Sequence, residues 1–111
     1  MRSVALVLFL ILFATPLIAS EIDQSFVRAA DASMAKMMGG MDIKASGDVD
    51  RDFVAMMVPH HRAAIEMAAL ELQYGHDIQL KRLAQEIIVT QQDEITAMRL
   101  AIGEVGEPHE H

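Results

Sequence analysis

The segment MMVPHHRAAIEMA, residues 56–68, holds the side chains of this chain that are best suited to bind a metal ion. It contains two adjacent imidazoles, His60 and His61, each with a methionine four residues before it. Residues four apart lie on the same face of a helix, so Met56 with His60, and Met57 with His61, form pairs that could chelate from one helix. Neutral thioether sulfur selects Cu(I) and similar soft ions, and imidazole suits copper, zinc and nickel. The spacing therefore permits a copper site made of methionine and histidine, although methionines at helical spacing more often fill a core.

Two further segments hold donor side chains of the same kinds. The segment MAKMMGGM supplies four more thioethers, from Met34, Met37, Met38 and Met41. In the later segment LAQEIIVTQQDEITAM, Gln91 falls near the middle of the apolar side, Glu94 stands one turn later at its edge, and Met98 follows one turn beyond. We expect Gln91 and Glu94 to face the histidines, with Glu94 orienting one imidazole, as carboxylates commonly do at metal-bound histidines. Met57 and Met98 would then supply soft donors.

Both histidines are expected to face or border the interior of the protein. At about 100° per residue, His60 falls well inside the apolar side of a helix over 50–74, and His61 falls near its flank. Arg62 and Glu66 fall on the opposite side and are expected to face solvent. A buried polar group without a partner costs about 1–3 kcal/mol. The cluster therefore has two interpretations, a metal site or a set of polar side chains that satisfy one another.

Pro59 immediately precedes the histidine pair. It has no N–H to donate to the carbonyl of Ala55 and is expected to kink the helix there. The kink either wraps the helix around its core or opens it locally, so that the neighbouring methionines and histidines are splayed around one point. In the second case both imidazoles would reach one polar pocket.

The elements that position these residues are all expected to be helical. The apolar periodicity predicts three helices, over residues 22–38, 50–74 and 77–102. Asp48 or Asp50 can cap the second helix, Gly75 ends it, and Asp77 can cap the third. Only two or three residues join the last two helices, which must therefore lie antiparallel. The fold class is all-α, a helical bundle with a short N-terminal helix and a long antiparallel hairpin.

The first twenty residues, MRSVALVLFLILFATPLIAS, follow the order of a secretory signal. Arg2 is followed by an apolar run over 4–14, and small residues precede Glu21, so cleavage after Ala19 or Ser20 is expected. An uncleaved membrane anchor is the alternative, although the run is short of the roughly 20 apolar residues that span a bilayer. The expected divisions are the signal over 1–20, a Met-rich helix and linker over 21–47, the hairpin over 48–103 and a disordered tail over 104–111.

Composition excludes several classes of partner and site. The 111 residues include 16 acidic and 9 basic side chains, a net charge of −7, and loss of Arg2 with a signal would make the balance more negative. Nucleic acids and anionic membrane surfaces reward basic patches, so neither is expected as a partner. The chain has no cysteine, which removes thiolate nucleophiles and cysteine-based zinc sites. It also lacks the His-Glu-x-x-His motif of zincins and the Glu-x-x-His pairs of di-iron bundles.

The segments GDVDRDFVAMMVPHHRAAIEMA and LAQEIIVTQQDEITAM resemble bacterial domain-of-unknown-function family 305, which includes the CopM-like periplasmic copper-binding proteins. The resemblance covers residues 34–102 and implies a ferritin-like helical bundle, usually exported, with copper or silver binding in some members. The residues that match the family motif are Met57, His60, His61, Gln91, Glu94 and Met98. The cluster over 34–41 is similar to Met-rich segments of the copper-binding members. The chain has a single short copy of the motif, which argues against copper storage at high capacity.

Together these features predict an exported, periplasmic or secreted protein that binds Cu(I) or Ag(I) and acts as a chaperone or buffer in copper tolerance. A copper-handling protein is an expected partner, and no membrane association is expected once the signal is cleaved. Three short helices bury limited apolar area, so a homodimer is also expected. Two alternatives remain open at this point: a structural or adaptor bundle with a buried polar cluster, and a di-metal enzyme.

Overall fold

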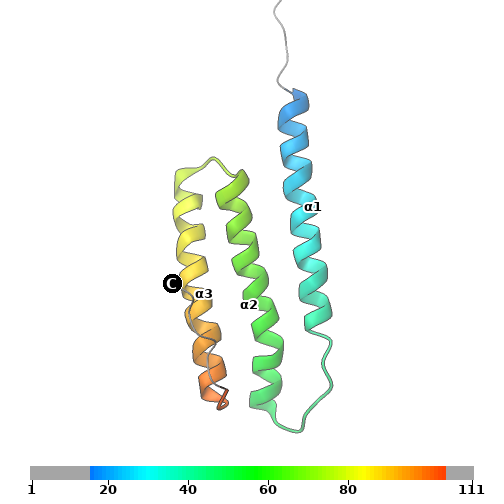
Figure 1. The fold of residues 1–111 in the computed structure, drawn as a ribbon, viewed down its shortest axis with the longest axis vertical. Coiled ribbons are helices and arrows are strands. Elements are labelled where there is room, and N and C mark those ends of the chain that lie inside the picture. Colours follow the sequence, from blue (N-terminus) through cyan, green and yellow to red (C-terminus); the bar gives the residue numbers. More distant parts are fainter. Residues whose placement is uncertain (1–15, 105–111) are drawn as a thin grey trace, which may run out of the picture.

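The computed structural model describes residues 16–104, which fold into three α-helices. The helices are α1 (Pro16–Gly40), α2 (Val49–Tyr74) and α3 (Ile78–Ala101) (Figure 1). No strand occurs within this part of the chain, so the predicted all-α class is confirmed. None of the described helices is both long enough and apolar enough to cross a membrane. Residues 1–15 of the predicted signal (1–20) and residues 105–111 of the predicted tail (104–111) lie outside the described residues.

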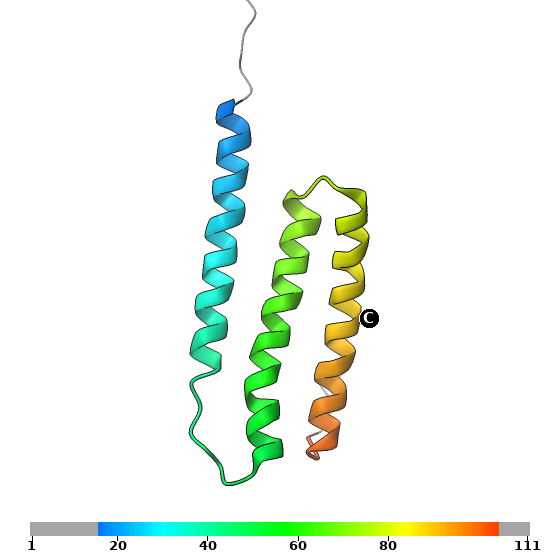
Figure 2. The same cartoon turned by 180° about the vertical axis from the view of Figure 1, so that it is seen from behind.

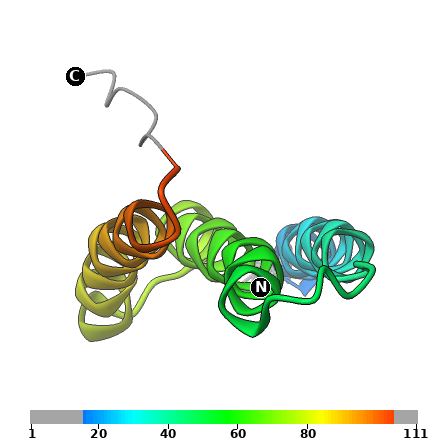
Figure 3. The same ribbon diagram turned by 90° about the horizontal axis from the view of Figure 1, so that it is seen from below.

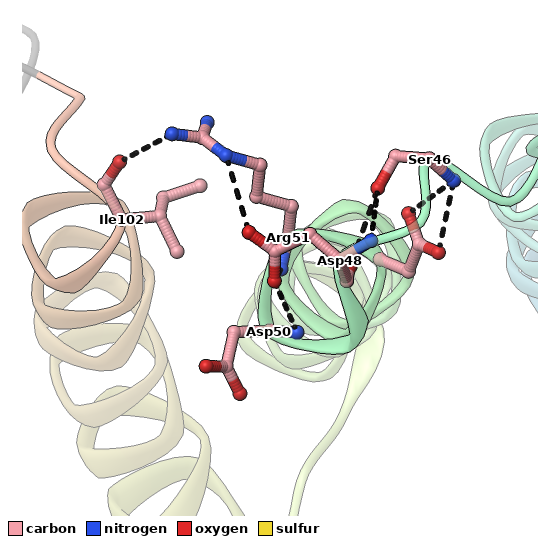
Figure 4. Close-up of polar contacts among 6 residues, drawn as sticks. Ser46, Asp48, Asp50, Arg51 and Ile102 are labelled. Carbon is pink, nitrogen blue, oxygen red and sulfur yellow. Dashed lines mark hydrogen bonds and ion pairs between the residues drawn. The ribbon is translucent and has the colours of Figure 1, made fainter.

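The expected caps are present at the starts of α2 and α3. The Asp48 carboxylate accepts hydrogen bonds from the backbone N–H groups of Asp50 and Arg51, and Asp77 does the same for Gln79 and Leu80. These bonds satisfy N–H groups that have no partner inside a helix. Figure 4 shows the Asp48 cap with Arg51, whose guanidinium also donates to the Ile102 carbonyl at 3.3 Å, so that the start of α2 is tied to the end of α3.

Helix α1 is longer than expected. It begins at Pro16 instead of Ile22 and continues as an α-helix of 25 residues. Proline is well suited to the first position of a helix, where its missing N–H would have had no partner. The leucine, isoleucine and alanine that follow Pro16 allow the helix to continue. As a result, the N-terminal turns of α1 extend beyond the end of the α2–α3 hairpin (Figure 2).

The three helices form an open layer one helix thick. Helix α2 lies between α1 and α3 and packs against both, whereas α1 and α3 make no contact within the described residues. The end-on view shows the row (Figure 3). The predicted helical bundle is confirmed, and its three helices lie in one row with α2 in the middle. Helix α2 packs through two opposite flanks, one against α1 and one against α3. It does not bury one broad apolar side in a single core.

A polar contact joins α1 to α2. The Ser33 hydroxyl is buried and donates to Glu66 Oε2 at 2.6 Å, and Lys36 Nζ donates to Glu66 Oε1 at 2.8 Å. Both bonds lie beside a cavity of about 150 Å³ that is also lined by Arg62 and Pro59. The prediction that Glu66 faces solvent is wrong, because its side of α2 is the flank that packs on α1.

The close approach of α1 and α2 depends on Gly40. A methyl group at this position would lie 2.9 Å from Pro59 Cβ, so the two backbones approach closely only because Gly40 has no side chain. Farther along the same interface, Phe26 and Tyr74 meet edge to face, with ring centroids 6.2 Å apart. Helix α1 therefore runs antiparallel to α2, with Gly40 opposite Pro59.

The Glu66 contact predicts an acid-sensitive interface between α1 and α2. The hydrogen bond from Lys36, and then that from Ser33, hold the pKa of Glu66 below its ordinary value of 4.5. A carboxyl whose pKa is lower in the folded protein adds stability above its unfolded pKa and loses it as the pH falls through the folded-state value. We therefore expect Glu66→Gln to lower the free energy of unfolding at pH 7, and the difference from the parent to shrink below pH 4.5.

Urea denaturation at pH 7 and pH 3.5, followed by circular dichroism, measures this difference. Glu86→Gln is the control, because Glu86 is an exposed carboxylate on α3 and makes no hydrogen bond in the described part of the chain. A Glu66→Gln effect of the same size at both pH values would contradict the prediction.

Candidate functional site

His61 is buried between α2 and α3. Its side of α2 packs against α3, and the residue is 7% exposed. Ring atom Nδ1 is 3.0 Å from the Met57 carbonyl oxygen, and Nε2 is hydrogen-bonded to Glu94 Oε2. The prediction that Glu94 faces a histidine across the hairpin is thus confirmed for His61.

Both ring nitrogens of His61 have an oxygen partner. A carbonyl and an ionised carboxylate can only accept hydrogen bonds, so both bonds form together when the ring carries a proton on each nitrogen. A hydrogen bond between charged groups is shorter and stronger than a neutral one. His61 would have to give up one of these bonds to bind a metal ion. In this arrangement it joins α2 to α3.

The His61–Glu94 contact also sets the register of the hairpin. One turn back along α2 from His61 is Met57, and one turn forward along antiparallel α3 from Glu94 is Met98. These two methionines therefore lie at the same level of the hairpin, and both are half-buried. Gln91 lies one turn to the other side and is also half-buried. Five of the predicted site residues are thus brought to one stretch of the α2–α3 interface.

His60 is exposed, and the prediction that it faces a core is wrong. Adjacent residues of a helix point about 100° apart, so burial of His61 against α3 turns His60 toward the side of α2 that neither neighbour covers. Its ring makes no hydrogen bond or ion pair in the described part of the chain. The two histidines therefore do not share a pocket.

Pro59 does not bring the neighbouring donors to one point. Helix α2 is continuous from Val49 to Tyr74, and its methionines and histidines leave it in different directions. The proline ring packs instead against Gly40 of α1. Pro59 therefore contacts a glycine of another helix. The sequence of α2 alone could not predict this contact.

Three other methionines of the predicted set lie at about the level of His60 along the helices. Lys36 and Arg62 line the cavity on one side of the layer. Residues two apart on a helix point roughly 160–200° apart. Met38 is two residues from Lys36 and His60 is two residues from Arg62, so both face the other side of the layer. Since Gly40 lies opposite Pro59, Met38 of α1 and Met41, just after α1, are within about one turn of His60 and Met56 along the axis.

We call Met38, Met41, Met56 and His60 the soft-donor cluster. Met38 and Met56 are exposed and Met41 is half-buried. Met34 follows on the same side of α1, one turn farther from the linker. Met37 does not join them, because it lines the cavity between α1 and α2. The predicted ligand set is therefore divided: five residues lie in the α2–α3 interface, four form the soft-donor cluster, and Met34 and Met37 belong to neither group.

Within residues 16–104, no three side chains of His, Asp, Glu or Cys come close enough together to hold a metal ion. A site built mainly from carboxylates, such as a di-iron centre, is therefore not formed by the described residues. Apart from Gln91, the other donors of the predicted set are thioethers, which favour soft ions.

The fold and the site define an all-α protein whose central helix carries one histidine tied to a glutamate and one exposed histidine beside thioethers. The chain belongs to the family described as "Domain of unknown function (DUF305)", whose model matches residues 16–102. The match establishes the family and assigns no ligand to it.

A relative from Acanthamoeba polyphaga mimivirus, "Uncharacterized protein L153", is 36% identical to this chain over 55 residues. The aligned part makes up 50% of this chain and 36% of the relative, so the chain spans about a third of that protein's length. The similarity adds no activity or partner.

The buried pair predicts a specific loss of stability. Glu94→Ala leaves His61 Nε2 without its partner in a mostly buried position, and we expect the free energy of unfolding to fall by about 1–3 kcal/mol. His61→Ala removes the hydrogen bonds and the packing together and should cost at least as much. Chemical denaturation of the metal-free protein gives both values. His76→Ala, in the exposed interhelical loop, is the control and should change little; equal effects at His61 and His76 would rule out the proposed joining role.

Proposed function

We propose that this protein binds Cu(I) or Ag(I) through the soft-donor cluster and serves outside the cytoplasm as a buffer or chaperone for the ion. The observation that carries the proposal is the exposed imidazole of His60, which has no partner within the described chain and lies level with thioethers from two helices. An imidazole and several thioethers match the preferences of Cu(I), which is soft and needs few ligands.

The arrangement of the donors supports transfer or buffering of an ion. Met38 and Met56 are exposed, and nothing in the described chain occupies their sulfur atoms. Donors on the surface of a folded layer can bind and release an ion without unfolding of the protein. A buried structural metal site would instead couple binding to folding.

The hairpin donors play a second part in the proposal. Met57 and Met98 lie level with each other beside the His61–Glu94 pair, and their position supports a role for His61 in holding the helices in place. In this proposal Glu94 positions α3 against α2, and the ion is bound next to His60.

A second candidate is a structural or adaptor bundle that binds no metal. The specific observation in its favour is the complete satisfaction of His61, whose two ring nitrogens both have oxygen partners. Metal analysis of the purified protein separates the two candidates. Stoichiometric copper or silver favours the first, and absence of metal after incubation with Cu(I) under reducing conditions favours the second.

Export is part of the proposed function. The order of a basic start, an apolar run and small residues over 1–20 supports a cleaved signal. Methionine donors form no disulfides, so they suit an oxidising compartment. N-terminal sequencing of the protein from its host is expected to begin at Ser20 or Glu21. A sequence that begins at Met1 or Arg2 would show that the segment is retained.

The two histidines are expected to affect metal binding differently. His60→Ala should weaken Cu(I) binding at least tenfold, about 1.4 kcal/mol or more, because it removes the imidazole of the cluster. His61→Ala should weaken binding less, in proportion to its loss of stability. Competitive titration with a chromophoric Cu(I) chelator gives the dissociation constants, with His76→Ala as the control. A His61→Ala protein that is folded but binds Cu(I) more weakly than His60→Ala would place the site in the hairpin instead.

A further inference from the structure

One side of the helical layer is apolar and uncovered. We call it the open face, and its exposed members are Val27, Met34, Met38, Val49, Phe53, Met56, Leu80 and Leu83. The rotation of about 100° per residue around each helix places all of these side chains on one side of the layer. In α1 and α2 they lie opposite Lys36 and Arg62, which line the cavity on the other side. In α3, Leu80 and Leu83 line a groove shared with Ala64 and Met67 of α2.

The two sides of the layer differ in charge. The basic residues Lys36, Arg51 and Arg62 lie on the side opposite the open face, as do Lys44 and Arg99 of the polar cavity beside the linker. By the same helical phase, the open face carries no lysine or arginine among the described residues. Its acidic side chains include Asp23 of α1, Glu71 near the hairpin loop and Glu94, which is paired with His61. An anionic membrane or a nucleic acid would find no basic patch there.

A single layer buries too little apolar surface to account for this face. Among the described residues, the buried hydrophobic side chains are two valines and three alanines, and no side chain is fully buried. Eight large apolar side chains of the open face remain exposed instead. Burial of such side chains contributes about 1.5–3 kcal/mol each, so a partner that covers the face would add a second, larger core.

The size of the open face matches a stable interface between two proteins. Helices of 24–26 residues are about 36–39 Å long, and neighbouring helices pack about 8–10 Å apart. Three helices side by side therefore present roughly 900 Å² per copy. A stable complex of standard size buries about 800 Å² from each partner.

The shape of the face is complementary to itself. Phe53 stands out from α2 near its N-terminus, at 55% exposure. The apolar groove between α2 and α3, with a volume of about 320 Å³, lies near the other end of the same face. If a second copy is laid on the first with its α2 antiparallel and centred midway between His60 and Ala64, Phe53 of each copy comes to the level of Glu71, where the partner's groove lies.

We infer that two copies of this chain stack through their open faces about a two-fold axis between the layers, with Phe53 of each copy in the α2–α3 groove of the other. The result is a two-layer assembly of six helices. Like other two-fold interfaces, it uses the same patch on both subunits. The inference rests on the apolar face alone and does not depend on the proposed function.

The stacking would place the two His60 side chains and their neighbouring thioethers on facing layers. Donors from both copies would then surround the same region of the interface. Because the apolar contacts require no ion, the dimer forms without metal. A test in the presence of a strong chelator therefore separates failure of the dimer from failure of metal binding.

Matched leucine substitutions test the face. Leu80 and Leu100 are 52% and 60% exposed on α3 and point to opposite sides of it. Leu80→Glu places an acid in the first turn, which a helix dipole favours, whereas Leu100→Glu places one in the last turn, which it disfavours. We expect sedimentation of the full chain in chelator to give a dimer for the parent and for Leu100→Glu, and at least a tenfold weaker dimer for Leu80→Glu. Unchanged association of Leu80→Glu, or equal loss in both variants, overturns the inference.

Cysteine cross-linking locates the contact, because the chain has no cysteine of its own. Ala64 lies on the open face next to His60, and Ala55 points about 180° away on the same helix. With a short bismaleimide and chelator, Ala64→Cys should form covalent dimers and Ala55→Cys should not. The inference is overturned if Ala64→Cys stays monomeric and reacts freely with maleimide. It is also overturned if Ala64→Cys is monomeric but is shielded by the chain's own N-terminal segment, or if the chain is monomeric until it binds neutral lipid vesicles.

Discussion

The structure depends on the position of α2 between two helices that do not touch each other. A helix with neighbours on opposite flanks buries two narrow stripes, and the surface between the stripes stays open. On α2 one stripe contains Glu66 and Pro59 and the other contains Val58 and His61. The open layer, the exposure of His60 and the apolar face all follow from this arrangement.

Polar contacts hold both flanks of α2 in register. On the α1 side the Glu66 carboxylate accepts from Ser33 and Lys36, and on the α3 side His61 is bonded to Glu94. Apolar contacts alone would allow neighbouring helices to slide by a turn, because alanine and valine fit many positions. A hydrogen-bonded pair that is partly buried loses its bonds if the helix shifts. The two contacts thus specify how the methionines of three helices line up.

Adjacent histidines serve different purposes in this arrangement. The peptide chain turns about 100° between them, which is enough to bury His61 and expose His60. The buried ring is satisfied by oxygen atoms of the protein, and the exposed ring has none. The same turn places the exposed ring on the face that a second copy would cover. Metal binding and self-association would therefore meet at His60, where each could influence the other.

The sequence alone determined the three helices and the ends of α2 and α3, whereas α1 begins six residues earlier than predicted. Apolar positions three and four residues apart, Asp48 and Asp77 as caps and Gly75 as a terminator predicted α2 and α3 to within about two residues, because these signals act within one or two turns of the chain. The pairing of Glu94 with a histidine also followed, since a short loop forces antiparallel packing and brings the middle of α2 to the later turns of α3.

Only the tertiary structure decided which side of each helix is buried. An apolar stripe shows that a surface avoids water and does not show whether the same chain or another copy covers it. For this reason His60 was expected inside a core and Glu66 in solvent, whereas His60 is exposed between the two packed flanks of α2 and Glu66 is half-buried against α1. The methionines are divided into two groups for the same reason. Which sides of α1 and α3 face α2 depends on contacts between helices that are distant in sequence.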